Sequence, residues 1–323
     1  MALDSLTYFR PNLKDCTLDD QDLEQSCPLD NGKHQSRLKH DLGDLDALPV
    51  EITGNILIQI DLRTLTDFRR VNNRAMQVVD SILEYKLIIN HSPAALRGML
   101  SINLASHCSC QDLMQTLNTA ECEECGDFAG YINLLTCKRV CFLCLDEKPK
   151  YFPLTTLEAG RRFGLDRSLL SVLPALKSIP GRYSSKQSLY KSRLTLIDTE
   201  EARRTGVEHH GSAEAMENCV AEAGQKKLEL FRQGRLRRRP NIDAKEGRVA
   251  DSRRFMAIVR TPWIQKSSND VELGFHCRGC ERCYRERPMH WRRKYDASSF
   301  ADHLEECGLI VDGVHRIAQI EGV

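Results

Sequence analysis

Four cysteines near the middle of the chain have the spacing of a metal site. Cys122 and Cys125 form one C-x-x-C pair, and Cys141 and Cys144 form another, with fifteen residues between the pairs. Two cysteines three positions apart on a tight turn can direct both sulfurs at one ion, each at about 2.3 Å. This spacing indicates a zinc site. Because four thiolates close the tetrahedron and leave no position for water, we expect the site to be structural.

A second group of possible ligands lies toward the C-terminus. Cys277 and Cys280 form another C-x-x-C pair, and His303 and Cys307 follow in the segment 298–307, which has the pattern of a capped helix. Residues four positions apart share one face of a helix, so His303 and Cys307 can both face the cysteine pair. We therefore expect a second zinc site, formed by Cys277, Cys280, His303 and Cys307.

In each of the two expected sites, another cysteine could take the place of one ligand. Cys137 lies four residues before Cys141 and could replace Cys144, or it could pack as a small apolar side chain. Cys283 repeats the spacing of three after Cys280 and could replace a ligand of the second site. Two further histidine candidates near the second site are His276 and His290.

The composition favours metal binding over disulfide bonding. The chain has 323 residues, 14 cysteines and a formal net charge of +1. It has no window near the ~18 apolar residues of a membrane helix, and its N-terminus lacks the basic start and apolar core of a signal peptide. We expect the protein in the cytoplasm, the nucleus or both, where thiols stay reduced. The small net charge gives no whole-chain argument for binding nucleic acid or membranes.

The residues before the first cluster have the pattern of three short helices. Pro49 suits the first position of a helix, since its missing N–H is not needed there. Thr64 followed by Asp67 is similar to a capping box and begins a second helix. Asn72 can cap a third helix. The apolar faces of the first and third helices are Ile52, Ile56, Leu57 and Ile60, and Met76, Val79, Leu83 and Leu87.

The same segment resembles an F-box, the short helical module that docks a protein onto the Skp1 adaptor of a cullin-type ubiquitin ligase. The matching positions are, in order, Leu48, Pro49, Glu51, Ile52, Ile56, Leu57, Asp61, Leu62, Leu65 and Val71. The family usually carries a Trp shortly after the Val, whereas Ala75 stands here and buries less apolar surface, worth on the order of 1–3 kcal/mol. The resemblance implies contact with Skp1, and through it with cullin-1, by Leu45, Leu48, Pro49, Ile52 and Val71.

The resemblance extends beyond this module. The string from Cys122 to Cys144 is similar to a cysteine-rich segment that follows the F-box in many filamentous-fungal F-box proteins, and so is the string from Lys177 to Tyr183. The similarity spans residues 45 to about 230, and the C-terminal C-x-x-C with H-x₃-C recurs in that group. The chain is identified on these residues as a member of the group, which says almost nothing about the target.

These patterns divide the chain into five parts and predict a predominantly α fold with small β elements. The parts are a mobile tail over 1–41, the F-box over 42–91, a helical and cysteine-rich body with a zinc-stabilised hairpin over 92–230, a basic linker over 231–270, and a zinc-finger-like segment over 271–323. The linker contains the run Arg235–Arg239, which fits a nuclear import signal, a nucleic-acid patch or a solvated linker.

The function expected from these features is that of a non-catalytic adaptor. The chain lacks a G-x-S-x-G string, a phosphate-binding glycine loop, an H-E-x-x-H string and a dinucleotide fingerprint. Its F-box would hold Skp1, its zinc-stiffened body would bind a protein target, and a partner RING–E2 pair would transfer ubiquitin. The alternative is a zinc-dependent nucleic-acid or transcription-associated binding protein. The arginine run, however, has no interleaved aromatic residues of the kind that a stacking platform needs.

Overall fold

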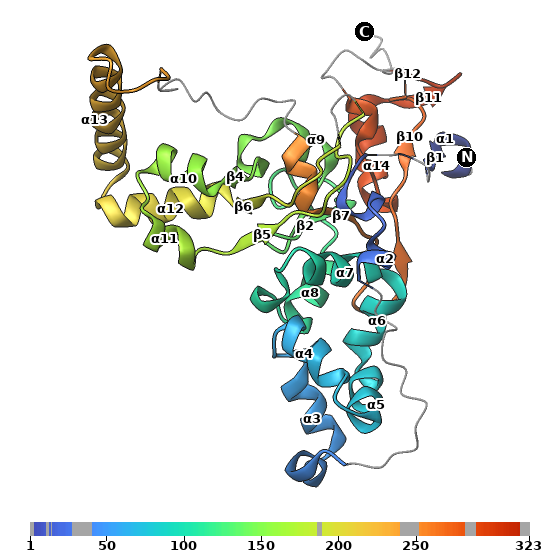
Figure 1. Ribbon diagram of the computed structural model, residues 1–323. Coiled ribbons are helices and arrows are strands. Elements are labelled where there is room, and N and C mark those ends of the chain that lie inside the picture. The colour runs from blue at the N-terminus through green and yellow to red at the C-terminus, as the bar shows by residue number, and fades with distance from the viewer. Residues whose placement is uncertain are drawn as a thin grey trace.

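The chain folds into three arms around a small central sheet, as a computed structural model shows (Figure 1). The structure describes residues 3–10, 13, 15–27, 41–185, 189–239, 252–281 and 289–316. Within them the regular structure is largely helical, and the strands pair in small antiparallel sheets. The described helices include none that is long and apolar enough to cross a lipid bilayer.

The lower arm in Figure 1 is a stack of helices around the largest apolar core. Its elements are η2 (Gly43–Ala47), α3 (Val50–Leu57), α4 (Leu62–Arg69), α5 (Asn73–Ser81), α6 (Leu83–His91), α7 (Pro93–Ser101), η3 (Ala105–His107) and α8 (Cys110–Leu117). Side chains at helical spacing point inward, and Leu62, Leu65, Ile88 and Leu96 are fully buried. Burying each such side chain stabilises the arm by about 1.5–3 kcal/mol.

The helices of this arm begin near the predicted positions, with two differences. Asp61 caps α4 by accepting the backbone N–H of Thr64 at 2.9 Å, so the helix starts before the predicted Thr64. Asn72 caps α5 as predicted, accepting a backbone N–H of the first turn at 2.8 Å. The sequence predicts that this helix continues to Leu87, whereas the structure ends it before Ile82, whose extended backbone angles separate α5 from α6.

The central sheet joins segments that are far apart in the sequence. Its strands are, in spatial order, β3 (Lys138–Val140), β2 (Tyr131–Asn133) and β7 (Ile258–Arg260). β2 and β3 pair antiparallel with Tyr131 opposite Val140, which confirms the hairpin predicted between the two cysteine pairs. β7 pairs with the other edge of β2. Helix α9 (Phe142–Glu147) follows β3, and the turn η4 (Pro149–Tyr151) follows α9.

β7 shows that the second half of the expected basic linker, 231–270, belongs to the fold. Met256 and Val259 are fully buried in the largest core. The turn η5 (Ser252–Ala257) leads directly into the strand, and within it Arg254 is also buried, with its guanidinium 4.0 Å from the ring centroid of Phe152. The basic residues of this stretch suggested a linker because a three-residue strand adds few apolar positions to the pattern.

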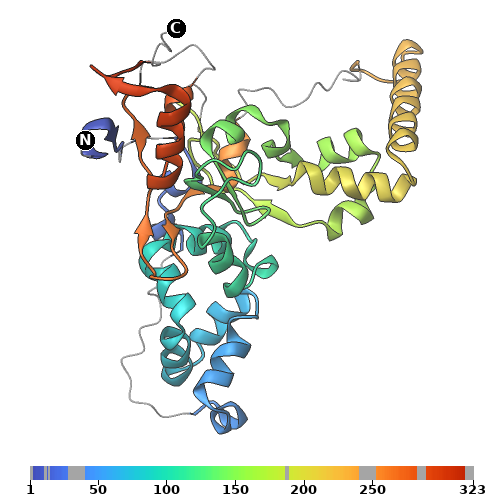
Figure 2. The ribbon, with the colours of Figure 1, turned by 180° about the vertical axis from the view of Figure 1, so that it is seen from behind.

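A second arm extends from the central sheet toward the upper left of Figure 1. Its elements are β4 (Leu154–Thr155), α10 (Thr156–Phe163), α11 (Arg167–Val172), β5 (Ala175–Lys177), β6 (Thr195–Ile197), α12 (Thr199–His210) and α13 (Ala213–Arg232). The strands form a sheet in the order β4-β6-β5, and α10 and α12 pack on it around a separate core. Helix α13 projects from the end of this arm in both views (Figures 1 and 2).

The third arm contains the second group of expected ligands. Its elements are β8 (Trp263–Ile264), β9 (Val271–Glu272), β10 (His276–Cys277), η6 (His290–Arg292), α14 (Ala297–Cys307), β11 (Leu309–Val311) and β12 (Val314–Arg316). The Asp296 carboxylate caps α14 by accepting the Ser299 N–H at 2.8 Å. β11 and β12 form a hairpin whose turn residues, Asp312 and Gly313, both have positive φ.

The N-terminal segment packs onto the rest of the molecule. Its elements are α1 (Leu3–Leu6), β1 (Thr7–Tyr8), η1 (Leu18–Asp20) and α2 (Leu23–Ser26). β1 pairs with β10, Leu18 and Leu23 lie in the largest core, and Asp15 forms a buried ion pair with Arg292 at 2.8 Å. The described part of 1–41 is therefore not the mobile tail that the sequence predicts. Two leucines in a polar segment gave no periodic pattern from which to foresee this packing.

Candidate metal centres

The first cysteine pair lies on a tight turn that precedes the central hairpin. The N–H of Cys122 donates to the carbonyl oxygen of Asp127 at 2.8 Å, and the N–H of Gly126 donates to that of Cys122 at 3.0 Å. Gly126 has a φ of +77°, a conformation that a residue without a Cβ adopts at little cost. The turn therefore presents Cys122 and Cys125 from one short loop.

The second pair begins helix α9, directly after the hairpin returns the chain. Cys141 is the N-cap of α9, and its Sγ accepts the backbone N–H of Cys144 at 3.4 Å. The Sγ atoms of Cys122, Cys125, Cys141 and Cys144 all lie within 4.8 Å of one another, with 3.6 Å between those of Cys125 and Cys141. Four sulfurs at about 2.3 Å from one ion would be about 3.8 Å apart. The cluster therefore has the size of a four-thiolate metal site.

The sulfurs of this cluster share their protons unevenly. The thiols of Cys125 and Cys141 donate hydrogen bonds to the sulfur of Cys122 and hold the pKa of Cys122 well below its usual range. Burial raises the pKa of Cys144 to about 12. The thiolate is the form that binds metal, and a bound cation would release the remaining protons.

Cys137 does not belong to this group of four. It lies in the turn between β2 and β3, and its Sγ is 3.3 Å from the Sγ of Cys108, next to α8. The structure therefore does not place Cys137 in the position of Cys144, and it gives Cys137 a different sulfur as its neighbour.

The second cluster combines residues from four separate places in the third arm. Cys277 lies on β10, Cys280 on the turn after it, His303 on α14 and His315 on β12. Their ligand atoms lie within 4.8 Å of one another. Nε2 of His315 is 3.2 Å from the Sγ of Cys277 and 3.5 Å from that of Cys280, and Nε2 of His303 is 3.4 Å from the Sγ of Cys280.

This set differs from the expected one at one residue, because His315 stands where the sequence predicts Cys307. α14 ends at Cys307, and the β11–β12 hairpin then folds back toward the cysteine pair. The hairpin brings His315 within reach of the two sulfurs. The Asp312-Gly313 dipeptide between short apolar runs is a hairpin signal that could have pointed to this return. Cys283, the other alternative, lies outside the described residues.

Hydrogen bonds at the far side of each imidazole orient the two histidines. Nδ1 of His303 is 3.2 Å from the hydroxyl of Tyr295, and Nδ1 of His315 is 2.8 Å from the carbonyl oxygen of Gly308. A carbonyl accepts only, so Nδ1 of His315 donates to it and the lone pair of Nε2 points toward the sulfurs. Partners of this kind are what fixes the tautomer of metal-binding histidines.

The two spare histidines do not belong to the second cluster. His276 is buried, and its Nδ1 lies 3.1 Å from the carbonyl oxygen of Arg293. His290 is buried in the turn η6. The thiol of Cys280 donates a hydrogen bond to the sulfur of Cys277, and this is the largest cause of the lowering of the pKa of Cys277 to about 3. Two clusters of cysteine and histidine that could hold metal ions are thus present, and their ligand types are consistent with zinc.

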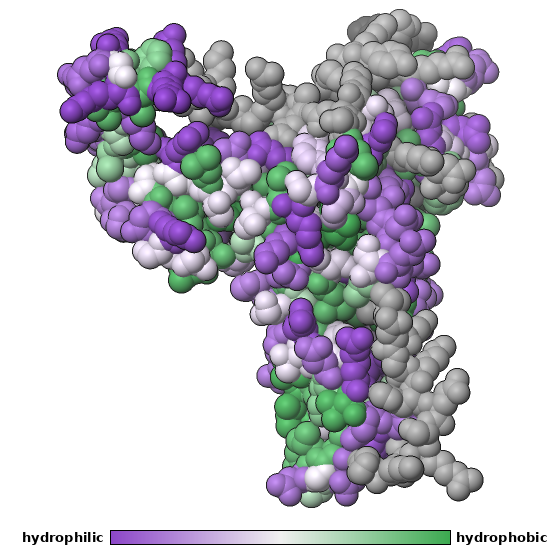
Figure 3. Space-filling model, viewed as in Figure 1, coloured by the Kyte–Doolittle hydropathy of each residue, from purple (hydrophilic) through white to green (hydrophobic). Residues whose placement is uncertain are grey.

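Apart from the clusters, the lower arm exposes an apolar face at its tip. Leu45, Leu48, Ile52 and Val71 are all at least 37% exposed, and Pro49 is exposed as well. Two further exposed side chains, Val50 and Ile56, lie on α3. Figure 3 shows apolar side chains gathered at this end of the arm, near α3. We call these seven residues the α3 face.

Ala75 does not lie on the α3 face. It is fully buried in α5, where it packs inside the arm.

A comparison of the chain with protein-family models, with curated proteins and with solved structures finds no significant match. The geometry of the clusters and of the α3 face is therefore what supports an interpretation of function.

Proposed function

We propose that this protein is the substrate-recognition adaptor of an SCF-type ubiquitin ligase, with residues 42–91 as its F-box. The observation on which this rests is the α3 face, an exposed apolar surface at the tip of a helical arm. It includes all five residues for which the resemblance implies contact with Skp1. We propose cytoplasm or nucleus as the place of action.

The exposure of the α3 face favours a partner that covers it. Thr53 and Leu57 turn inward from α3 and are buried, so the helix is already anchored by its other side. The outward side chains Ile52 and Ile56 add nothing to that core, since each keeps nearly half of its surface in water. Covering such half-exposed side chains would contribute about 1 kcal/mol each to association. Helix faces of this kind are a common mode of protein recognition.

We further propose that both clusters bind zinc as structural ions. Thiolate and imidazole ligands in groups of four suit zinc, and a closed set of four protein ligands leaves no open position for catalysis. In this proposal the first ion fixes the turn at Cys122 to the start of α9, and the second fixes α14 to β10 and β12. The protein itself is non-catalytic, and a partner RING–E2 pair transfers ubiquitin.

The target surface is proposed to lie on the zinc-stabilised body, away from the α3 face. A cavity of about 700 Å³ opens between the central hairpin and α12. Both signs of charge line it, with Lys138 and Lys150 near one wall and Glu200, Arg203 and Arg204 near the other. A mixed-charge cavity of this size suits a polar segment of a protein better than an apolar ligand.

Changing Leu48 and Pro49 together to Ala tests the docking surface. Both side chains are exposed, so the helices should stay folded, while affinity for recombinant Skp1 should fall by at least about 30-fold, as for truncated hot spots worth about 2 kcal/mol. Leu157→Ala is a matched control, because Leu157 is exposed on α10 in another arm. Equal Skp1 affinity of the double variant and the wild type, measured by calorimetry, would show that the docking assignment is wrong.

The alternative is a zinc-dependent nucleic-acid or transcription-associated binder. The observation that favours it is the run Arg235–Arg239, which is exposed directly after α13. Changing its four arginines to Gln should then abolish DNA binding whose affinity falls steeply with salt. A wild-type protein that binds Skp1 and shows no salt-dependent DNA binding supports the adaptor proposal instead.

A further inference from the structure

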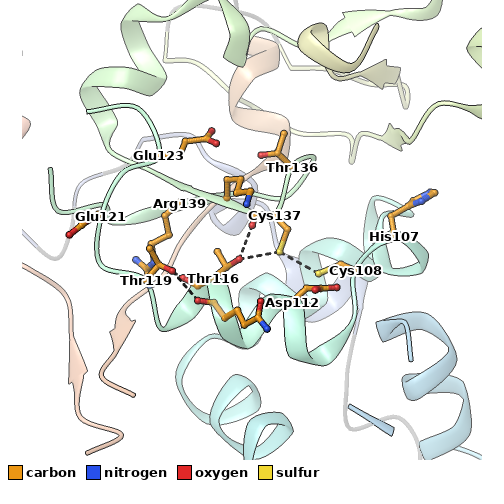
Figure 4. Close-up of a pocket in the computed structure, with 12 residues that line it drawn as sticks. His107, Cys108, Asp112, Thr116, Thr119, Glu121, Glu123, Thr136, Cys137 and Arg139 are labelled. Carbon is orange, nitrogen blue, oxygen red and sulfur yellow. Dashed lines mark hydrogen bonds between the residues drawn. The ribbon is translucent and has the colours of Figure 1, made fainter. Parts of the chain in front are cut away.

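Two cysteines outside both metal clusters lie side by side at a pocket. The Sγ atoms of Cys108 and Cys137 are 3.3 Å apart, although the residues are 29 positions apart in the chain. Cys108 comes just before α8, and Cys137 lies in the turn of the central hairpin. Figure 4 shows the two sulfurs pointing toward each other, with Thr116 beside them.

The pocket gives small molecules access to this pair. Its volume is about 470 Å³, and its lining includes Cys108, Cys137, His107, Asp112 and Lys138. Cys108 is 5% exposed, whereas Cys137 is half-buried and therefore the more accessible of the two. The pocket is far larger than a small peroxide, which could reach the sulfur of Cys137 through it.

The position of Cys137 is held by a neighbouring hydroxyl. The hydroxyl of Thr116 donates to the carbonyl oxygen of Cys137 at 2.7 Å and lies 3.6 Å from its sulfur. The thiol of Cys108 donates a hydrogen bond to the sulfur of Cys137 and lowers the pKa of Cys137, while the same interaction raises the pKa of Cys108. Cys137 is thus the sulfur with the greater thiolate character, and Cys108 lies in position to react with it next.

We propose that Cys108 and Cys137 form a redox site that reacts with hydrogen peroxide, or another small peroxide, and closes to a disulfide. The proposal rests on the distance between the two sulfurs, their shared pocket and the exposure of Cys137. It does not depend on the function proposed above.

The chemistry proceeds in two steps. The thiolate of Cys137 attacks one hydroxyl oxygen of the peroxide and the O–O bond breaks, so that Cys137 keeps this OH as a sulfenic acid. The other oxygen leaves as hydroxide, or as alkoxide from an organic peroxide, and takes up the proton that the Cys137 thiol had released, which gives water or the alcohol. The sulfur of Cys108 then attacks the sulfur of Cys137, the S–O bond breaks, and the hydroxide takes the proton of Cys108 and leaves as water. The two thiols together lose two electrons, and one peroxide gains them.

A disulfide here would connect the lower arm to the central sheet. The carbonyl oxygen of Cys108 accepts the backbone N–H of Leu62 at 2.9 Å, and Ser109 forms an isolated bridge with Asp61. Cys108 is thereby joined to the start of α4, in the arm that carries the α3 face. Cys137 belongs to the hairpin that carries the first metal cluster. Oxidation would fix these two parts covalently to each other.

Peptide mapping of the full-length, metal-loaded protein tests the proposal. The reduced protein is treated with a few equivalents of hydrogen peroxide, its remaining thiols are alkylated, and the digest is examined by mass spectrometry. We expect the peptide that contains Cys108 to be joined to the one that contains Cys137, with the loss of one hydrogen from each. The metal content of the same samples is measured, so that damage to the clusters is seen separately.

Three variants sharpen this test. Cys137→Ser should slow peroxide-dependent loss of the Cys108 thiol by at least about tenfold, because Cys108 is buried and would lose its reaction partner. Cys110→Ala is the matched control, since Cys110 is buried two residues away, and it should form the cross-link at the wild-type rate. Cys219→Ser removes an exposed cysteine on α13 and should likewise leave the cross-link unchanged.

The outcomes separate the proposal from general oxidation. A cross-link that forms in the wild type and in both controls, with a rise in melting temperature on oxidation that Cys137→Ser does not show, supports the site. If Cys108 and Cys137 both stay reduced while Cys219 is oxidised, the pair is only a packing contact. Oxidation of Cys137 to the sulfinic acid without a link to Cys108 would equally overturn the proposal.

Discussion

Replacing His315 tests the second metal centre most sharply, because His315 and Cys307 compete for the fourth ligand position. In a tetrahedral zinc site with sulfur at about 2.3 Å and nitrogen at about 2.05 Å, a sulfur and a nitrogen are about 3.6 Å apart. The distances from Nε2 of His315 to the two cysteine sulfurs, 3.2 and 3.5 Å, are close to that value. We therefore expect His315→Ala to remove a ligand and Cys307→Ser to remove none.

The expected loss of zinc affinity follows from dividing the free energy of zinc binding equally among four ligands. Structural zinc binding is worth about 10–16 kcal/mol, so one ligand of four carries about 2.5–4 kcal/mol, or roughly 70- to 900-fold in affinity. The loss should appear as zinc taken from His315→Ala by a chromogenic chelator at concentrations that leave the wild type loaded. Only one of the two ions should be affected, because the two clusters share no residue.

Cys307→Ser is the matched control for this experiment. Its affinity should stay within a few-fold of the wild type, since Cys307 is not among the four grouped residues. The reasoning is refuted if the serine variant loses the ion and the His315 variant keeps it. Full retention of the ion in both variants would show that neither residue is a required ligand, and absence of this ion from the wild type would show that the cluster binds none.

The remaining predictions concern stability and metal dependence. The Cβ of Gly54→Ala in α3 meets nothing within 4 Å, so this change should raise the free energy of unfolding by about 0.5–1 kcal/mol. The Cβ of Gly206→Ala in α12 would lie 3.0 Å from a carbonyl oxygen of α10, so this change should lower the free energy of unfolding by about 1–3 kcal/mol. Urea titrations measure both. Burial lowers the pKa of Lys294 from 10.5 to about 8, so the folded state loses this proton at a lower pH than the unfolded state does. Relative to Lys294→Met, the wild type should therefore gain about 2–3 kcal/mol of stability as pH rises from 8 to 10.5. A stability difference between the two proteins that does not change with pH would contradict this. Removing metal with a chelator should abolish hydrogen-exchange protection over 121–145 and leave it in place over 50–91, because the first cluster lies within a segment too small to fold alone; unchanged protection over 121–145 would show that the cysteines only pack.

The first cluster could be predicted because all its determinants are local. The C-x-x-C turns, the hairpin between them and the return of the chain to Cys141 follow from residues within one short stretch. The helices of the lower arm were predictable for the same reason, from apolar spacing and from caps such as Asn72. Two boundaries were missed. α4 starts at Leu62, before the predicted Thr64, and the break at Ile82 gave no sign, since it is an apolar residue inside an apolar pattern.

The parts that could not be predicted depend on contacts between distant segments. The burial of Leu18 requires α7 and β7, which come about 80 and 240 residues later in the chain, and nothing near Leu18 encodes it. The fourth ligand at His315 requires the β11–β12 hairpin to fold back on α14. His303 and Cys307 both lie on α14, as their spacing predicts, but the hairpin places His315 rather than Cys307 beside the cysteine pair.

The placement of the N-terminal segment has a consequence for synthesis on the ribosome. Asp15 binds Arg292 and Asp19 binds Arg260, so residues 15–23 are made long before their partners leave the ribosome. Until β7 is made, Leu18 can be covered by α7 alone, and the nascent chain leaves part of this apolar site exposed to other chains. These contacts can form only after Arg260 and Arg292 have left the ribosome. A chain truncated before residue 260 would never reach that state.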